Sequence, residues 1–371
     1  MTNLTVIYLQ ANCLKELPES IKHLVNLEVL DVSCNELVSI PSTIGHLKQL
    51  KKLVLTQNKI KCLPDSIGQL ASLVSLLLNF NSLQSLPYSL RNCLLLRELC
   101  IDRNSFQILP NFLTRLPNLQ VLSVCGNKLL YLPFIPFAAI QHFHCDTNSQ
   151  LTYLPYALAC QMNQTPLNPL VTKGVLHIDC YGCFQRCQET HDTCASVSVT
   201  VKDAERDGRD YWRVDFPPHL HLSKSTEVPT LTELVLGSLI RREFEKIMTI
   251  CGDHSLNIHH FKVSTLFNQH YDDWVQNLDA KLPSTLIELL RQGPTAFCFN
   301  MDCVKPIFAT VYPLFVPKIM VQRPSPPHVA LQRILCCLLF CSSHCFQRYQ
   351  RVSQAWETVM FDSRLDDWNN V

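Results

Sequence analysis

The sequence predicts an α/β solenoid over residues 1–170, with a parallel sheet of short strands on its concave face. A small cysteine-rich α+β domain is expected to follow over residues 171–371. Two observations support this architecture. A pattern of leucine, asparagine and proline recurs every 23 residues through the first part of the chain. The second part loses that period, and its cysteines are clustered.

The repeat is clearest between Leu27 and Leu50, where the sequence reads LEVLDVSCNELVSIPSTIGHLKQL. Its asparagine recurs at Asn12, Asn35, Asn58, Asn81, Asn104, Asn127 and, after a shortened unit, Asn148. Its proline recurs at Pro18, Pro41, Pro64, Pro87, Pro110, Pro133 and Pro155. A period of this length and composition is typical of a leucine-rich repeat array.

Each residue type of the repeat has a structural reason. In L-x-x-L-x-L the apolar residues alternate with polar ones, which predicts a short strand whose leucines point inward. The asparagine follows where the backbone turns, and its amide can satisfy backbone groups that the turn leaves unpaired. The later L-P-x-x-I-x-x-L segment predicts a helical or 3₁₀ turn that begins near proline. One repeat cannot bury its leucines alone, but a stack of repeats can.

The residues between the strand leucines are expected to face outward on the concave side. The predicted partner-binding residues are Tyr8, Asp31, Val54, Leu77, Asn79, Phe80, Asp102 and Arg103. Among them, the apolar side chains should form a patch bordered by the charged pair Asp102 and Arg103. Such a patch is typical of a protein-binding surface. For any single residue, an ordinary exposed side chain is the alternative interpretation.

The chain enters its first repeat at Leu4 without a polar capping segment. Terminal repeats usually need such a cap. We therefore expect either a longer natural N-terminus or a partner that covers this end.

Composition excludes several functions. The formal net charge is +1, which provides no basic field for nucleic acid. The first residues do not have the charged and apolar regions of a signal peptide. The apolar run Ile334–Phe340 is too short to cross a bilayer. The 19 cysteines therefore predict reduced thiols and metal ligands in a cytosolic or nuclear protein.

Two cysteine pairs in the second half have the spacing of a structural zinc site. Cys298 and Cys303 form the first pair, and Cys341 and Cys345 form the second. Four thiolates can close a tetrahedral zinc site that has no open position for water. Cys336, Cys337 and His344 are competing ligands. Simple burial of the thiols is the remaining alternative, because free cysteines are often buried.

An earlier group contains Cys180 and Cys183, with Cys187, His191 and Cys194 nearby. The C-x-x-C spacing suits a zinc site or a thiol redox pair, and both interpretations stay open. The sequence has no Gly-rich phosphate loop, G-x-S-x-G or H-E-x-x-H motif. We therefore predict no enzyme, with thiol redox chemistry as the enzymatic alternative. A zinc-dependent nucleic-acid role is a further alternative.

Regular elements are also expected in the second half. Alternating apolar residues in 197–201 and 212–216, separated by a turn, predict a hairpin. Helices are predicted from Thr230 and within LPSTLIELLRQGP, residues 282–294.

The repeats resemble the intracellular leucine-rich repeat proteins of the Ras-suppressor type. The strings CYGC, PTLTELVLGSL, LPSTLIELL, IFATVYP and CSSHC together resemble a group of leucine-rich repeat-containing proteins with a shared C-terminal half. This chain departs from that group at the pair Cys298 and Cys303: where the group has a C-x-x-C, this chain has Asn300 before Cys303, and its first cysteine moves to Cys298.

TLTELVLGSL, residues 230–239, resembles the elongin-binding helix of cullin–ubiquitin-ligase substrate receptors. Leu231 would be the anchor, with Val235 and Leu239 one and two turns further along. Those motifs favour cysteine where this chain has Val235. The LPSTLIELL segment resembles the part that selects the cullin. This resemblance implies elongin B/C and a cullin as partners, and the alternative is an ordinary amphipathic helix. The primary prediction is a non-enzymatic protein-binding adaptor.

Overall fold

The structure is a computed structural model of residues 1–371. It describes residues 3–135, 137–162, 176–177, 197–202, 211–216, 221–222, 236, 274–275, 277–278, 282–292, 294–299, 303, 306–307, 310–321 and 331–352.

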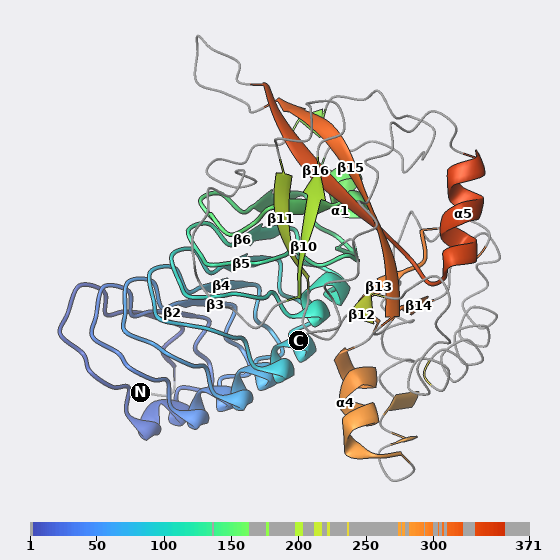
Figure 1. Ribbon diagram of the computed structural model, residues 1–371. Helices are drawn as coiled ribbons and strands as arrows, with labels where there is room; N and C mark the ends of the chain where they lie inside the picture. The colour runs from blue at the N-terminus through green and yellow to red at the C-terminus, as the bar shows by residue number, and fades with distance from the viewer. Residues whose placement is uncertain are drawn as a thin grey trace.

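The repeats form a solenoid with a seven-stranded parallel sheet (Figure 1). The strands are β1 (Val6–Tyr8), β2 (Val29–Asp31), β3 (Lys52–Val54), β4 (Ser75–Leu77), β5 (Glu98–Cys100), β6 (Val121–Ser123) and β7 (His142–His144). They lie in chain order, and from β1 to β6 each residue pairs with the one 23 positions further along, as Leu30 does with Leu53. This confirms the predicted leucine-rich repeat solenoid and its sheet of short strands.

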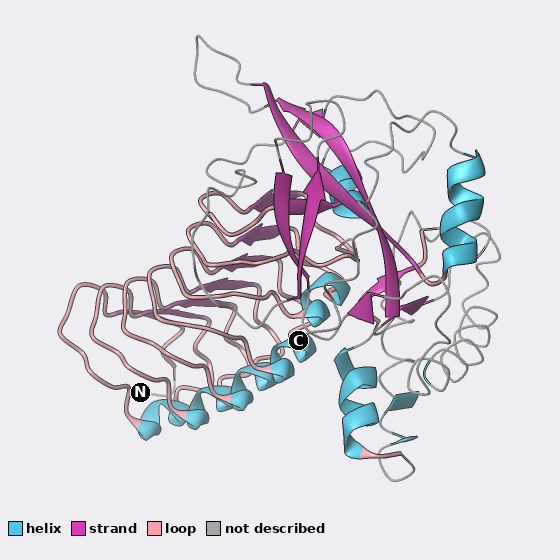
Figure 2. Ribbon diagram, in the orientation of Figure 1, coloured by secondary structure: helices cyan, strands magenta, loops and turns pink. Residues whose placement is uncertain are grey.

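A row of 3₁₀ helices lies along the other side of the coil (Figure 2). They are η1 (Glu19–His23), η2 (Ser42–His46), η3 (Asp65–Gln69), η4 (Tyr88–Asn92) and η5 (Asn111–Arg115). Each begins directly after a repeat proline, as η2 begins after Pro41 with its φ of −65°. Proline suits this place because its φ is already fixed near the required value.

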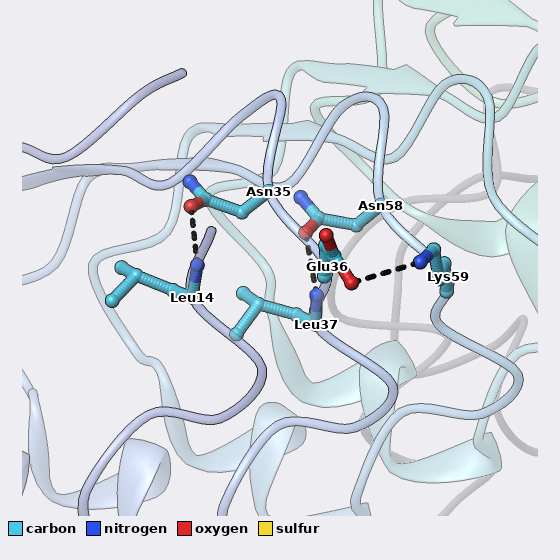
Figure 3. A network of polar contacts seen from close by, with 6 residues as sticks. All are labelled: Leu14, Asn35, Glu36, Leu37, Asn58 and Lys59. Carbon is cyan, nitrogen blue, oxygen red and sulfur yellow. Dashed lines mark hydrogen bonds and ion pairs between the residues drawn. The ribbon is translucent and has the colours of Figure 1, made fainter. Parts of the chain in front are cut away.

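The repeat asparagines form the predicted ladder. Asn58 Nδ2 donates to the carbonyl oxygens of Val32 and Leu55 at 3.0 and 3.1 Å, and its Oδ1 accepts from the backbone N–H of Leu37 at 2.9 Å. Asn35 makes the same contact with Leu14 one repeat earlier (Figure 3). Each amide therefore joins two repeats and satisfies backbone groups that the turns would otherwise bury without a partner.

The second part of the chain is built around a long antiparallel pair, β15 (Thr310–Val321) and β16 (Leu331–Phe340). The order of their sheet is β12 (His221–Leu222), β15, β16 and β8 (Tyr153–Pro155), and β9 (Leu176–His177) also pairs with β15. Strand β8 belongs to the last repeat. The sheet of the second part therefore includes a strand of the last repeat and is hydrogen-bonded to the C-terminal end of the solenoid.

The hydrophobic core is continuous across this junction. One cluster of buried residues extends from Leu17 in the first repeat to Tyr349 near the end of the described chain. At the junction, the rings of Tyr156 and Phe299 meet edge to face with centroids 5.5 Å apart. The second part therefore covers the last repeat. The boundary predicted at residue 170 lies outside the described residues.

Several further elements can be compared with the predictions. The hairpin is confirmed as β10 (Val197–Lys202) paired antiparallel with β11 (Tyr211–Phe216). The second predicted helix is α4 (Ser284–Gln292). Of the helix predicted from Thr230, the structure describes Leu236, which is helical and buried. The remaining elements are α1 (Tyr156–Met162), β13 (Ala296–Phe297), β14 (Pro306–Ile307) and α5 (Ser343–Val352).

Candidate functional site

The concave face presents outward side chains in rows that cross the strands. Neighbouring strands lie about 4.8 Å apart, so residues at the same repeat position become neighbours. In the row that includes Tyr8, the exposed fraction is 64% for Tyr8 but only 8% for Val54. Leu77 is half-buried. Val54 was predicted to be part of the exposed patch, and this is wrong. Its strand, β3, lies inside the sheet between β2 and β4, whereas Tyr8 lies on the edge strand β1.

Phe80 is the prominent apolar side chain of this face, with 47% of its surface exposed. The guanidinium carbon of Arg103 lies 5.4 Å from the centre of its ring. This is within the range of a cation–π contact, so the arginine holds one face of the ring. Phe80 and Arg103 were predicted as neighbours, but the prediction did not include their stacking.

Both residues occupy a repeat position with left-handed backbone. The residues with this conformation, at φ between 51° and 65°, are Ala11, Cys34, Gln57, Phe80, Arg103, Gly126 and Thr147. Such a φ costs a residue other than glycine roughly 1–2 kcal/mol. The recurrence at one position shows that the repeat imposes it. The left-handed conformation was not predicted from the sequence, although Gly126 at the same repeat position indicates it, because glycine adopts positive φ readily.

Two predicted binding residues also have structural roles. Asn79 Oδ1 accepts from the backbone N–H of Asp102 at 2.8 Å. Asp102 Oδ1 in turn accepts from the backbone N–H of Cys125 at 2.7 Å and from Ser123 Oγ at 2.6 Å. These side chains form a second polar ladder, on the concave side. A binding role for either residue therefore includes a contribution to the stability of the repeats.

The second candidate site is a group of four cysteines, Cys298, Cys303, Cys341 and Cys345, whose Sγ atoms all lie within 4.8 Å of one another. Two of the sulfur–sulfur distances are 3.5 Å, for Cys303 and Cys341, and 3.8 Å, for Cys341 and Cys345. Zinc–sulfur bonds of about 2.3 Å at tetrahedral angles separate two sulfurs by about 3.8 Å. The four thiols could therefore hold a metal ion with little movement.

Two chain segments bring these cysteines together, the connection between β13 and β14 and the corner between β16 and α5. Cys298 directly follows β13, and Cys303 lies before β14. Cys341 directly follows β16, and Cys345 is in the first turn of α5. The backbone N–H of Cys341 points at Cys298 Sγ from 3.5 Å. A helix start and a backbone N–H both favour negative charge on sulfur.

The competing ligands lie elsewhere. Cys336 and Cys337 are within β16 and buried in the core, with exposed fractions of 0% and 2%. His344 is exposed and is not a member of the cysteine group. Within the part of the chain that the structure describes, the four predicted cysteines are the group that comes together.

Contacts within the group and burial raise the pKa of two of the four thiols. A hydrogen bond with Cys298 lowers the pKa of Cys341, but contact with Cys303 and burial outweigh it and raise that pKa to about 12. Hydrogen bonds with Cys303 and Cys341, together with burial, raise the pKa of Cys298. Four adjacent thiolates repel one another, and a bound cation compensates that charge.

Other predicted site residues lie outside the described residues. These are the cysteines Cys180 and Cys183 and the elongin-like positions Leu231, Val235 and Leu239. In the described part of the chain, none of the helices combines the length and the apolar character needed to cross a membrane.

A family comparison agrees with the repeat architecture. Residues 1–165 match the family model described as "Leucine-rich repeat region". No curated protein matches the chain.

Among solved structures, the chain is similar to the leucine-rich repeat protein LIC12759 of Leptospira interrogans. The identity is 26% over 49% of this chain and 50% of that one, with a TM-score of 0.39. It is also similar to the leucine-rich repeat domain of the type III effector XopL, at 24% identity over 49% and 62% of the two chains, with a TM-score of 0.42. The plant peptide hormone receptor RGFR1, solved in complex with RGF2, is 28% identical over 42% of this chain and 28% of the receptor, with a TM-score of 0.35. The match to the first of these spans half of that protein's length.

Proposed function

From the match of residues 1–165 to a leucine-rich repeat family model, and from the solenoid that the described residues among them form, we propose that the chain is a non-enzymatic adaptor that binds a protein partner on its concave face. The observation that carries this proposal is Phe80. It is a large apolar side chain, 47% exposed, at a repeat position where the backbone conformation favours glycine.

The energetics of this position support a binding role. Phe80 contributes little to the free energy of folding, because about half of the ring stays exposed to solvent and its backbone is strained. Binding gains more, because aromatic residues and arginine are enriched among the residues that dominate protein interfaces. Arg103 holds the ring in one orientation, so less side-chain conformational entropy is lost when a partner binds. Half-buried Leu77 and Asp102 extend this surface.

Affinity capture or proximity labelling in cells would test the proposal and identify the partner. We expect the double variant Leu77→Ser/Phe80→Ser to keep its melting temperature and to lose the captured partner. The matched control is Val38→Ser, since Val38 is a similarly exposed apolar residue, at 50%, outside the concave rows. If the double variant captures the same proteins as the wild type, the concave face is not the binding surface.

The four-cysteine group is proposed to be a structural zinc site. The donor set fits, because four closely spaced sulfurs match zinc in number and separation. The ion would tie the β13–β14 segment to the β16–α5 corner, next to the core shared with the repeats. Metal analysis of the purified protein would test this, and we expect about one zinc per chain.

A second candidate function is that of a substrate receptor of an elongin–cullin ubiquitin ligase. Leu236, within the elongin-like segment, is buried in a small cluster with Val275 and with Leu290 of α4. Leu236 of the elongin-like segment and Leu290 of the segment that resembles the cullin-selecting element thus belong to one cluster, which supports the proposal that the two act together. The repeats would then hold the substrate.

Leu231→Arg separates the two candidates. Under the ligase function, this variant should stop elongin B/C from co-purifying while the repeats stay folded. Leu77→Ser/Phe80→Ser should keep elongin B/C and lose the substrate. If the wild-type protein captures no elongin, the ligase function is wrong, and the adaptor function stands by itself.

A further inference from the structure

The four cysteines of the candidate zinc site differ in their exposure to solvent. Cys298 and Cys345 are buried, with exposed fractions of 1% and 6%, whereas Cys303 and Cys341 are half-buried. Oxidation of a cysteine depends on its access to solvent as well as on its thiolate character. A small oxidant dissolved in water therefore reaches Cys303 and Cys341 before it reaches the other two.

The two half-buried cysteines are also close to each other. Their Sγ atoms are 3.5 Å apart, compared with 3.8 Å for Cys341 and Cys345. A disulfide places the two sulfurs about 2.0 Å apart, so they need to approach by about 1.5 Å. Cys303 lies between β13 and β14 and Cys341 lies directly after β16, so a bond between them would join two segments.

The corner that carries Cys341 and Cys345 is held in place by its own hydrogen bonds. Ser342 Oγ accepts from the backbone N–H of Cys345 at 3.2 Å, and the Ser342 carbonyl oxygen accepts from the backbone N–H of Phe346 at 3.1 Å. Ser342 thus caps the start of α5. Joining Cys341 to Cys345 would strain this cap, whereas joining Cys341 to Cys303 leaves it intact.

This inference rests on the structural zinc proposed above. Zinc binds thiolates, and the thiolate is the form of cysteine that reacts with a peroxide. Two sulfurs joined in a disulfide no longer carry the charge that binds zinc, and the two remaining cysteines do not complete a four-coordinate structural site. Oxidation of one pair is therefore enough to release the ion.

We propose that the four-cysteine group is a redox-sensitive zinc site, in which a hydroperoxide converts Cys303 and Cys341 to a disulfide and the zinc ion leaves. In the first step one thiolate attacks a peroxide oxygen, so that a sulfur–oxygen bond forms and the O–O bond breaks with loss of hydroxide or alkoxide. In the second step the other thiolate attacks the sulfenic sulfur, the S–S bond forms and hydroxide leaves. The two thiolates together lose two electrons to the peroxide, the released anions take protons from solvent, and zinc stays Zn²⁺.

The test uses the full chain with its zinc bound and the reductant removed, and hydrogen peroxide alone as the oxidant. A chromogenic chelator reports free zinc, and mass spectrometry of alkylated peptides identifies the disulfide. We expect peroxide to release about one zinc per chain and to protect Cys303 and Cys341, but not Cys298 and Cys345, from alkylation. Dithiothreitol and added zinc should restore the bound ion, because a dithiol reduces the disulfide by thiol exchange.

Cys303→His is the diagnostic variant. A histidine can take the place of one cysteine in a structural zinc site, but it cannot form a disulfide. The variant should hold zinc and release it to peroxide about tenfold more slowly than the wild type. Cys62→Ser, at an exposed cysteine outside the group, should release zinc at the wild-type rate. If Cys303→His does not hold zinc, the disulfide mapped in the wild type decides.

The outcomes separate this proposal from the zinc site on which it rests. A protein without zinc before the addition of peroxide would contradict the structural zinc site and this proposal together. Zinc that stays bound in excess peroxide, or that leaves without a disulfide between Cys303 and Cys341, overturns this proposal alone. Release at the wild-type rate from zinc-loaded Cys303→His would overturn it as well.

Discussion

Tyr88 donates its hydroxyl hydrogen to the backbone carbonyl oxygen of Arg291, 203 positions further along the chain. Arg115 Nη2 donates to the same oxygen at 2.9 Å, and the Arg91 guanidinium lies 4.6 Å from the centre of the Tyr88 ring. Arg291 is in the last turn of α4, where helix carbonyls have no partner within the helix. The repeats therefore cap this helix and fix its end against η4 and η5.

The first prediction tests this cap. Tyr88→Phe keeps the ring and removes one donor to the Arg291 carbonyl. We expect a loss of about 0.5–1.5 kcal/mol in the free energy of unfolding and faster amide exchange in α4. Exchange in η1 and η2 should not change. Tyr8→Phe, at an exposed tyrosine, is the control. Unchanged exchange in α4 would mean that Arg115 alone is sufficient.

The second prediction concerns the asparagine ladder. Asn58→Ala removes an amide that serves three backbone groups in the core. We expect each such change to lower the free energy of unfolding by roughly 1–3 kcal/mol, measured by chemical denaturation. Asn12→Ala should cost less, because Asn12 is exposed and bonds only within its own turn. Equal costs at the two positions would contradict the ladder as a main source of stability.

The third prediction separates binding from folding at Phe80. Phe80→Gly relieves the left-handed strain at φ 57° and removes the ring. The melting temperature should stay the same or rise, while partner capture should fall at least tenfold. Gln57→Gly makes the same backbone change at the same φ one repeat earlier and should keep capture intact. A large loss of stability in Phe80→Gly would show that the ring serves the fold.

The repeats could be predicted because their information is local. Each 23-residue unit contains its own leucines, asparagine and proline, and the neighbouring unit repeats them, so strand, turn and 3₁₀ helix follow without knowledge of distant contacts. The four-cysteine group was also predictable as two pairs. Its separation from Cys336 and Cys337 was not, because that depends on where β16 ends.

Features that depend on distant partners could not be predicted. The pairing of β8 with β16 joins residues about 180 positions apart, and nothing in the Tyr153–Pro155 sequence indicates it. The burial of Val54 does not follow from its position in the repeat, which is the same as that of exposed Tyr8; β3 lies inside the sheet and β1 at its edge. The cap on Arg291 likewise depends on a backbone carbonyl, which carries no sequence signal.

The fourth prediction concerns the structural zinc. A strong chelator should remove about one zinc per chain and increase protease cleavage around β13, β14 and α5, while the repeats keep their resistance. Cys345→Ser should have the same effect without chelator, and Cys62→Ser should have none. Because zinc competes with protons for the thiolates, lowering the pH should also release it. A metal-free protein with an unchanged digestion pattern would contradict this prediction.

The fifth prediction follows from a buried thiol in the solenoid. Burial raises the pKa of Cys93 to about 12, whereas an unfolded cysteine ionises near pH 8.5–9. Between these values the folded state keeps a proton that the unfolded state loses, so stability must fall as the pH rises from about 9 to 12. For one group the slope is at most about 1.4 kcal/mol per pH unit. In Cys93→Ala, denaturation of the repeats should depend less steeply on pH over this range, although the variant starts from lower stability. Cys62→Ala, at an exposed position, should keep the wild-type slope. If Cys93→Ala also keeps that slope, other groups cause the alkaline loss of stability.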